Sequence, residues 1–157
     1  FWAIYSHLVR PGDVSISGDY HLFKENIKPI WEDDHNREGG KWVLRLKKGL
    51  ASRYWEDLLL AIIGEQFDVG EEVCGVVISV RFHEDLISIW NANHNNRDAI
   101  MKIRDTMRRV LALPPSALLE YKAHDIAASK AADVLDGGGA GPGTGMPRTM
   151  SERGYTS

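Results

Sequence analysis

The fold class of this chain is decided by residues 72–90, which read EVCGVVISVRFHEDLISIW. Apolar side chains recur at every second position, which is the periodicity of a β-strand. Two charged residues, Glu84 and Asp85, divide the stretch and predict a long β-hairpin. Cys74 has the same parity as Val76 and Ile78, so we expect it on their face of the sheet.

A two-residue turn between the two strands sets the expected register of this hairpin. It places Arg81 opposite Ser88 and Ser79 opposite Trp90. Arg81 and Trp90 then share one face of the sheet, and a slip of one residue would separate them.

Outside the hairpin, the spacing of apolar residues predicts further helices and strands. The expected helices span residues 1–9, 51–64 and 97–111, and the expected strands span residues 19–23, 42–46 and 117–121. Leu60 falls outside the apolar stripe of its helix, so we expect it at the surface, and Gly64 suits the helix end. This order predicts an α+β domain, an antiparallel sheet with helices packed on one face.

The composition excludes several classes of function. The 157 residues suffice for one domain, and 43% hydrophobic residues support a core. A net charge of −3 argues against general nucleic-acid binding through phosphate neutralisation. The single cysteine rules out an internal disulfide. No apolar run approaches the roughly 20 residues of a membrane span, so we expect no membrane contact.

Both ends of the chain differ from the rest. The chain begins with the apolar residues Phe1-Trp2-Ala3-Ile4-Tyr5 and no Met, which we interpret as a fragment whose first strands are missing. The other end is rich in glycine from residue 136 onward and has almost no core formers. We therefore expect a domain at residues 1–130 and a disordered tail at residues 131–157.

No catalytic motif is present, so we expect neither an enzyme nor a cofactor. Adjacent carboxylates in one loop, such as Glu32 and Asp33, rarely point at one bond from opposite sides. His83 and His94 lack the spacing of zinc ligands. Cys74 is expected to be a small buried hydrophobe.

Residues 30–42, which read IWEDDHNREGGKW, are the strongest candidate for a binding loop. Trp31 offers a π-face to a flat cationic ring, and Glu32 offers a charged acceptor to ring N–H groups. In the alternative interpretation, Trp31 belongs to the core and Glu32 is a solvated loop residue.

Arg81 suits phosphate binding through its bidentate fork. Alternatively, it is a rim residue paired with Glu84 or Asp85. Together with Trp31, Glu32, Trp90 and Lys130, it would supply the groups that a cationic guanine nucleotide requires.

Many stretches of the chain resemble a known family. The stretches that carry the resemblance are Phe1-Trp2, Pro11–Asp13, His21–Glu25, Ile27–Pro29, Trp31–Asp34, Gly39–Trp42, Lys48–Arg53, Trp55-Glu56, Gly64–Phe67, Val69–Glu72, Cys74-Gly75, Ser79–Phe82, Glu84-Asp85, Ile87–Asn91, Leu113–Pro115 and Glu120–Lys122. They resemble the eukaryotic translation initiation factor 4E family of messenger-RNA cap-binding proteins, and within it the class II, or 4E-homologous, branch.

The resemblance implies a curved antiparallel sheet with helices on its convex face and a cap site on its concave face. It implies that Trp31 stacks on the N7-methylguanine, that Glu32 binds its Watson–Crick edge and that Trp90 contacts the methyl group. Arg81 and Lys130 would bind the phosphates. The resemblance also implies that the family's second stacking aromatic falls upstream of Phe1.

The resemblance also implies protein partners on the convex face. Helical peptides of 4E-binding proteins or of the initiation scaffold would dock at Trp2, Leu60 and Gly64. Core packing is the alternative role of Trp2. An apolar dock position of the initiation factor is Glu56 here, which favours repressor partners.

Leu86 and His83 stand where the classical factor has lysines, so a weaker grip on the phosphates is expected. The resemblance thus implies a cytoplasmic monomer that binds the cap weakly and represses translation. A ribosome-recruiting initiation factor and a protein-interaction module without cap binding are the alternatives.

Overall fold

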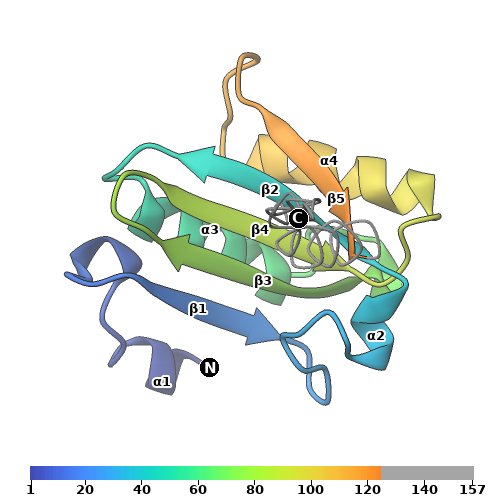
Figure 1. The fold of residues 1–157 in the computed structure, drawn as a ribbon, viewed down its shortest axis with the longest axis horizontal. Helices are drawn as coiled ribbons and strands as arrows, with labels where there is room; N and C mark the ends of the chain where they lie inside the picture. Colours follow the sequence, from blue (N-terminus) through green and yellow to red (C-terminus); the bar gives the residue numbers. More distant parts are fainter. Residues whose placement is uncertain (125–157) are drawn as a thin grey trace, which may run out of the picture.

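The computed structural model describes residues 1–124 as one antiparallel sheet with helices against it (Figure 1). Its strands are β1 (Gly18–Phe23), β2 (Gly40–Leu46), β3 (Val73–Val80), β4 (Asp85–Asn91) and β5 (Leu119–Ala123). Its helices are α1 (Trp2–Tyr5), α2 (Asp34–Arg37), α3 (Ala51–Ile63) and α4 (Arg97–Val110), with 3₁₀ turns at Pro11–Asp13 and Gly70–Glu72. Lys130 and the expected tail at residues 131–157 lie outside the described residues.

The strands follow one another in the order β1-β3-β4-β2-β5, and every neighbouring pair is antiparallel. The long helices α3 and α4 lie behind the sheet in Figure 1. No long helix of residues 1–124 covers the opposite face, which we call the open face. The predicted α+β class, a curved antiparallel sheet with helices on one side, is therefore confirmed.

The core lies between the sheet and the two long helices. Its members include Trp42, Leu44, Val76, Ile78, Ile87 and Ile89 from the strands and Trp55, Leu58, Leu59, Ile103 and Met107 from the helices. The indole N–H of Trp42 donates to the carbonyl oxygen of Ile100 over 2.9 Å and so joins β2 to α4. Alternate strand residues fill this core, which leaves the residues of the other parity for the open face.

The predicted hairpin exists, but its predicted register is wrong. Val80 pairs with Asp85 and Ser79 with Leu86, so a four-residue loop, not a two-residue turn, joins β3 to β4. Trp90 consequently lies opposite Gly75. The difference is an even number of residues, so the side chains from Gly75 to Val80 and from Leu86 to Trp90 keep their predicted faces while their neighbours across the strands change.

The predicted face of Cys74 is also wrong. A β-bulge interrupts the pairing between Val73 and Gly75 and moves Cys74 to the open face, where it packs with Val77 and Trp90. Bulges insert one residue into a strand and so reverse the parity on one side of the insertion. Cys74 is fully buried, as expected for a small hydrophobe.

Several predicted element boundaries shift, and β2 begins at Gly40, two residues before its predicted start. The helix expected at residues 1–9 is limited to α1, because from His7 onward the backbone N–H groups bond three residues back instead of four. The last strand begins at Leu119, two residues later than predicted. The boundaries of α3 and α4 agree with the prediction to within one residue at each end.

Burial of Cys74 is expected to make this domain less stable at alkaline pH. Burial raises the pKa of the Cys74 thiol from its ordinary value of 9.0 to about 11. Because the thiol has a higher pKa in the folded than in the unfolded state, the protonated thiol contributes stability below pH 9. This contribution is lost as the pH rises towards 11. We expect the free energy of unfolding to fall by up to about 2–3 kcal/mol more in the parent chain than in Cys74→Ala across this window.

Urea unfolding at a series of pH values between 8 and 11 measures this difference. Tyr121, whose pKa burial raises to about 12, titrates in both proteins and cancels from the comparison. Parallel curves of stability against pH would contradict the assignment.

Candidate functional site

The loop that carries Trp31 and Glu32 is fixed by Asp33. One carboxylate oxygen of Asp33 accepts the backbone N–H of His35 over 3.0 Å, which caps α2, and the other accepts that of Lys28 over 3.1 Å. These two hydrogen bonds lower the pKa of the Asp33 carboxyl, so the cap stays ionised in more acidic solution than an ordinary aspartate would.

Asn36 fixes the same loop from inside the protein. Its side chain is fully buried, and its Nδ2 group donates to the carbonyl oxygens of Lys28 and Ile30, each over 2.8 Å. Buried amides with satisfied donors hold a loop in one conformation. The backbone around Trp31 is therefore positioned before any ligand arrives.

Trp31 and Glu32 are both presented to solvent. Trp31 is 44% exposed, so the alternative that assigned it to the core is wrong. Glu32 is exposed and has no hydrogen-bond or ion-pair partner among residues 1–124. A ring and a carboxylate on a fixed loop thus remain available to a ligand.

Trp90 lies on the open face near the end of β4 and is 8% exposed. Phe23 meets its ring edge-on at a centroid distance of 5.4 Å, and His124 lies against it at 4.4 Å. The ammonium of Lys41 stands 5.1 Å from the ring centroid. Burial, and to a smaller degree Lys122, lowers the pKa of Lys41.

The loop and Trp90 belong to the same end of the open face. Cys74, which packs against Trp90, donates its thiol to the carbonyl oxygen of His35 over 3.6 Å. Ile27, just before the loop, packs against the same apolar cluster. The structure therefore places the loop that carries Trp31 and Glu32 at the same end of the open face as Trp90.

Arg81 directly follows β3 at the opposite end of the open face. Its Nη2 forms an ion pair with Asp19 at 2.9 Å, and its Nη1 donates to the carbonyl oxygens of Gly18 and Val80. The alternative that paired its side chain with Glu84 or Asp85 is therefore wrong. Burial tends to raise the pKa of Asp19, but hydrogen bonds from Ser79 and Arg81 outweigh it and lower this pKa.

The two ends of the site are separated by the length of β4. Arg81 lies beside Asp85, and Trp90 is five residues further along that strand. At about 3.4 Å per residue, the separation is about 17 Å along the sheet. The site is thus elongated, with an aromatic and carboxylate end and a guanidinium end. Lys130, the other predicted phosphate ligand, lies outside the described residues.

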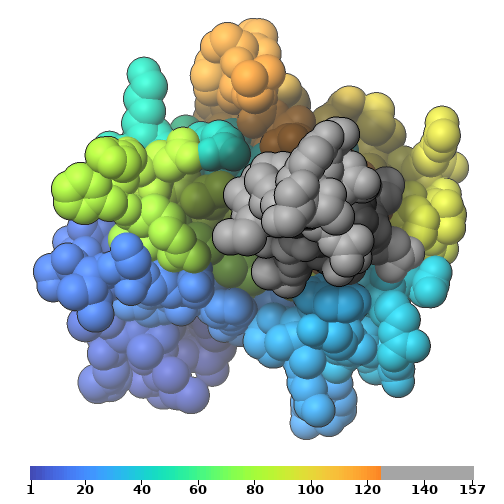
Figure 2. Space-filling view, viewed as in Figure 1, coloured from blue at the N-terminus to red at the C-terminus, as the bar shows by residue number. Residues whose placement is uncertain are grey.

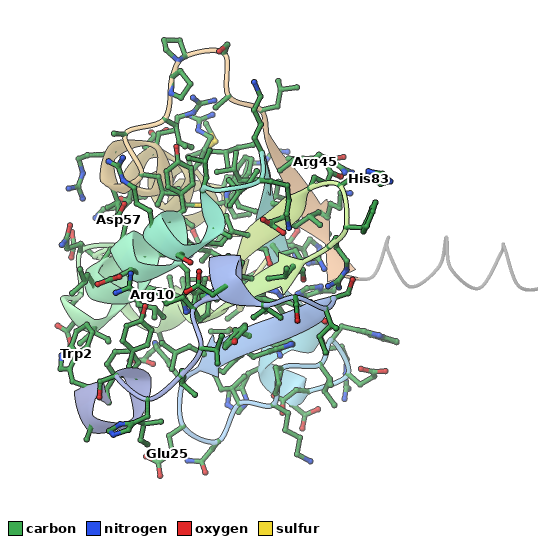
Figure 3. All side chains as sticks on the ribbon, turned by 90° about the vertical axis from the view of Figure 1, so that its left-hand side faces the viewer. Trp2, Arg10, Glu25, Arg45, Asp57 and His83 are labelled. Carbon is green, nitrogen blue, oxygen red and sulfur yellow. The ribbon has the colours of Figure 1, made fainter. Side chains whose placement is uncertain are left out.

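The predicted peptide-docking residues lie on the other side of the molecule. Trp2 and Leu60 are 48% and 46% exposed, so the alternative that places Trp2 in the core is wrong. Gly64 is exposed at the end of α3. Figure 3 shows Trp2 and Asp57 of α3 on the side opposite to Arg45 and His83.

The charges next to Trp2 come from Glu56 and Arg10. The ring of Trp2 meets that of Tyr5 edge-on at 5.6 Å. Burial and the charge of Glu56 raise the pKa of Tyr5, and the charge of Arg10 lowers it to a smaller degree. Glu56 and Arg10 therefore both border the exposed apolar surface at Trp2.

Sequence reasoning missed three residues of the site. Asp33 and Asn36 are residue types that favour helix N-termini, which is a signal that could have found them. Lys41 has the strand parity opposite to that of the core residue Trp42, so its place on the open face could also have been predicted.

The fold and this face define an α+β domain with an elongated candidate site across one side of an antiparallel sheet. The sequence model of the family described as Eukaryotic initiation factor 4E matches residues 1–135. The chain belongs to this family.

Individual relatives agree with this assignment. The chain is 53% identical over 125 residues to "Eukaryotic translation initiation factor NCBP" of Oryza sativa subsp. japonica, covering 80% of this chain and 55% of that protein. It is 54% identical over 125 residues to "Eukaryotic translation initiation factor 4E-4" of Caenorhabditis elegans, covering 80% of this chain and 59% of that protein. The chain thus spans little more than half the length of these relatives.

Solved structures give the same family. The structure of C. elegans eIF4E-3 in complex with the 4E-binding protein Mextli and a cap analog superposes with a TM-score of 0.78 at 37% identity, covering 82% of this chain and 75% of that chain. The structure of Ascaris suum eIF4E-3 with the m2,2,7G cap gives a TM-score of 0.75 at 38% identity, covering 78% and 71%. Among residues 1–124, no helix combines the length and hydropathy that crossing a membrane requires.

Proposed function

We propose that this chain binds the N7-methylguanosine cap of messenger RNA and regulates translation initiation in the cytoplasm as a class II, weakly binding repressor. The observation that carries the proposal is the exposed pair of Trp31 and Glu32 on a loop that Asp33 and Asn36 fix. Trp90 at the same end of the open face and Arg81 at the other complete the set.

Each group has a physical role toward this ligand. Methylation at N7 makes guanine cationic, so stacking on Trp31 gains a cation–π contribution that unmethylated guanine lacks. Glu32 accepts hydrogen bonds from the Watson–Crick N–H groups of the base, and its charge strengthens them. Trp90 would contact the methyl group, while Arg81, with Lys130, would hold the phosphates by charge. Phosphates extending from the base would bridge part of the 17 Å between the ends, a length that follows from strand geometry.

The cationic end supports weak binding. Arg81 must exchange its ion pair with Asp19 for a phosphate, which offsets part of the gain. Leu86 lies beside Arg45 and Ser79 on the open face and contributes no charge. Fewer free cations imply a weaker grip on a polyanion.

The partners that we propose are the mRNA cap on the open face and a helical peptide of a 4E-binding protein on the helix face. Exposed Trp2 and Leu60 offer the apolar contacts for such a peptide, a helix-in-groove arrangement. The acidic Glu56 near Tyr5 favours repressor peptides over the scaffold of the initiation machinery. A monomer suffices for both contacts.

Retention on N7-methyl-GTP resin tests the proposed function. We expect the chain to be retained and to elute with free N7-methyl-GTP, but not with GTP. Flow-through of the chain under conditions that retain a classical relative would favour the interaction module without cap binding. Strong, Trp2-dependent capture of the initiation scaffold would instead favour a ribosome-recruiting factor.

Replacement of Arg81 tests the phosphate end separately. We expect Arg81→Ala to weaken binding of N7-methyl-GTP and to flatten the dependence of log Kd on log salt by up to about one unit, because one phosphate contact is lost. Titration calorimetry at several salt concentrations measures the slope. Arg109→Ala, an exposed arginine on α4, is the matched control and should keep the parental slope. An unchanged slope in Arg81→Ala would argue against the phosphate role.

A further inference from the structure

Phe82 is a large apolar side chain that the fold leaves in solvent. It is 85% exposed in the loop between β3 and β4, directly after Arg81. Phenylalanine belongs to the residue types most often found inside proteins. In Figure 2 this loop (yellow-green) projects at the left edge of the open face, next to the start of β1 (blue).

The exposure of Phe82 is imposed by an anchored loop. Asp85 is buried, and its Oδ1 accepts the backbone N–H of Arg81 over 3.2 Å and the ammonium of Lys48 over 2.7 Å. The same ammonium donates to the carbonyl oxygen of Arg81 over 2.9 Å. The backbone N–H and C=O groups of Arg81, the residue before Phe82, are therefore both fixed by hydrogen bonds. This fixed backbone keeps the ring of Phe82 in solvent.

The surroundings of the ring are cationic. The two chain segments at this corner, residues 45–48 and 81–85, contain four basic residues and two acidic ones. Three ion pairs form here, Glu84 with Arg45, Asp85 with Lys48 and Asp19 with Arg81, so Lys47 leaves the corner with an excess of positive charge. Figure 3 shows Arg45 and His83 pointing to the same side of the molecule. An anionic partner is thus favoured here.

The exposed apolar surface at Phe82 is too small for a stable protein interface but large enough for a nucleobase. His83 meets the Phe82 ring edge-on at 4.8 Å, and charged residues Arg81 and Glu84 flank the pair. Stable protein interfaces bury about 800 Å² on each partner, far more than one ring offers. One exposed ring with cations around it is instead the arrangement that stacks a nucleobase and attracts its phosphate.

We propose that Phe82 stacks on a base of the RNA next to the cap, so that the open face binds capped RNA beyond the cap itself. This proposal rests on the proposed function, because the cap phosphates at Arg81 bring the following nucleotides to the adjacent Phe82. Every base has a π-face, so this contact adds affinity without selecting a sequence.

Calorimetric titration of the 157-residue chain with two ligands tests the proposal. One ligand is N7-methyl-GTP, and the other is a capped five-nucleotide oligoadenylate. We expect Phe82→Ala to lower the affinity for the capped oligonucleotide at least about fivefold. This factor is the lower end of the range measured for the loss of one base–aromatic stack. Phe82→Trp should retain that affinity. Leu118→Ala, an 86% exposed residue of the connection between α4 and β5, is the matched control and should change neither affinity.

The outcomes separate the two proposals. An equal loss for both ligands in Phe82→Ala, or no loss for either, would overturn the stacking proposal while leaving cap binding intact. Absence of N7-methyl-GTP binding by the parent chain would overturn the proposed function, and the stacking proposal with it.

Discussion

Replacement of Glu32 by alanine is expected to remove most of the affinity for N7-methyl-GTP. The substitution deletes a charged acceptor from the edge of a base that has left water, and the unpaired N–H donors then carry their full desolvation cost. We expect a loss of at least about 2–3 kcal/mol, or about thirtyfold or more in Kd. Fluorescence or calorimetric titration of the purified variant measures it.

Asp34 provides the matched control for Glu32. It lies two residues away, is also an exposed carboxylate, and forms an ion pair with Arg37 at 2.6 Å within the single turn of α2. Asp34→Ala removes the same charge from the same loop, so it should change Kd less than about threefold, as expected for an exposed ion pair. Similar losses in both variants would show a general effect of charge and contradict the assignment of Glu32 to the base edge.

Substitution of Gly39 by alanine is expected to have the largest effect on stability. A Cβ atom at Gly39 would lie only 1.9 Å from the backbone carbonyl oxygen of Asn91. Neither segment can move freely, because Gly39 donates to Asn36 over 2.9 Å and accepts from His124 over 3.0 Å. We expect destabilisation of about 3 kcal/mol or more, the upper range of overpacking, with loss of ligand binding because the same contact anchors the loop of Trp31.

Urea unfolding monitored by circular dichroism measures this effect. Gly18→Ala is the control, because a Cβ atom there meets no heavy atom within 4 Å. Its free energy of unfolding should stay within about 1 kcal/mol of that of the parent. If Gly39→Ala were equally mild, the close approach of the two backbones at this point would be wrong.

The helices and the sheet could be predicted because their signals are local. The apolar stripes of α3 and α4 give their extents to within one residue at each end. The hairpin register could not be predicted, because its loop length depends on buried Asp85, which bonds to Arg81 nearby and to Lys48 from 37 positions away in the chain. The bulge at Cys74 likewise depends on packing against Trp90 and not on a sequence signal.

The candidate site could likewise be predicted only where its residues are neighbours in the sequence. Trp31 and Glu32 could be singled out because ring, carboxylate and turn residues are adjacent in the sequence. Their relation to Arg81 could not, because the span of the site follows from the register of β4. The alternative that paired the Arg81 side chain with Glu84 or Asp85 was wrong because its partner, Asp19, lies 62 positions away in the chain.

The distribution of the tryptophans gives the molecule two optical reporters. Trp42, Trp55 and Trp90 are buried, whereas Trp2 on the helix face and Trp31 on the open face reach solvent. A dissolved collisional quencher such as iodide therefore reaches one indole on each side of the sheet. A cap analogue would shield the indole of Trp31 and a helical peptide that of Trp2, so simultaneous occupancy of both faces can be followed by emission from the unlabelled protein.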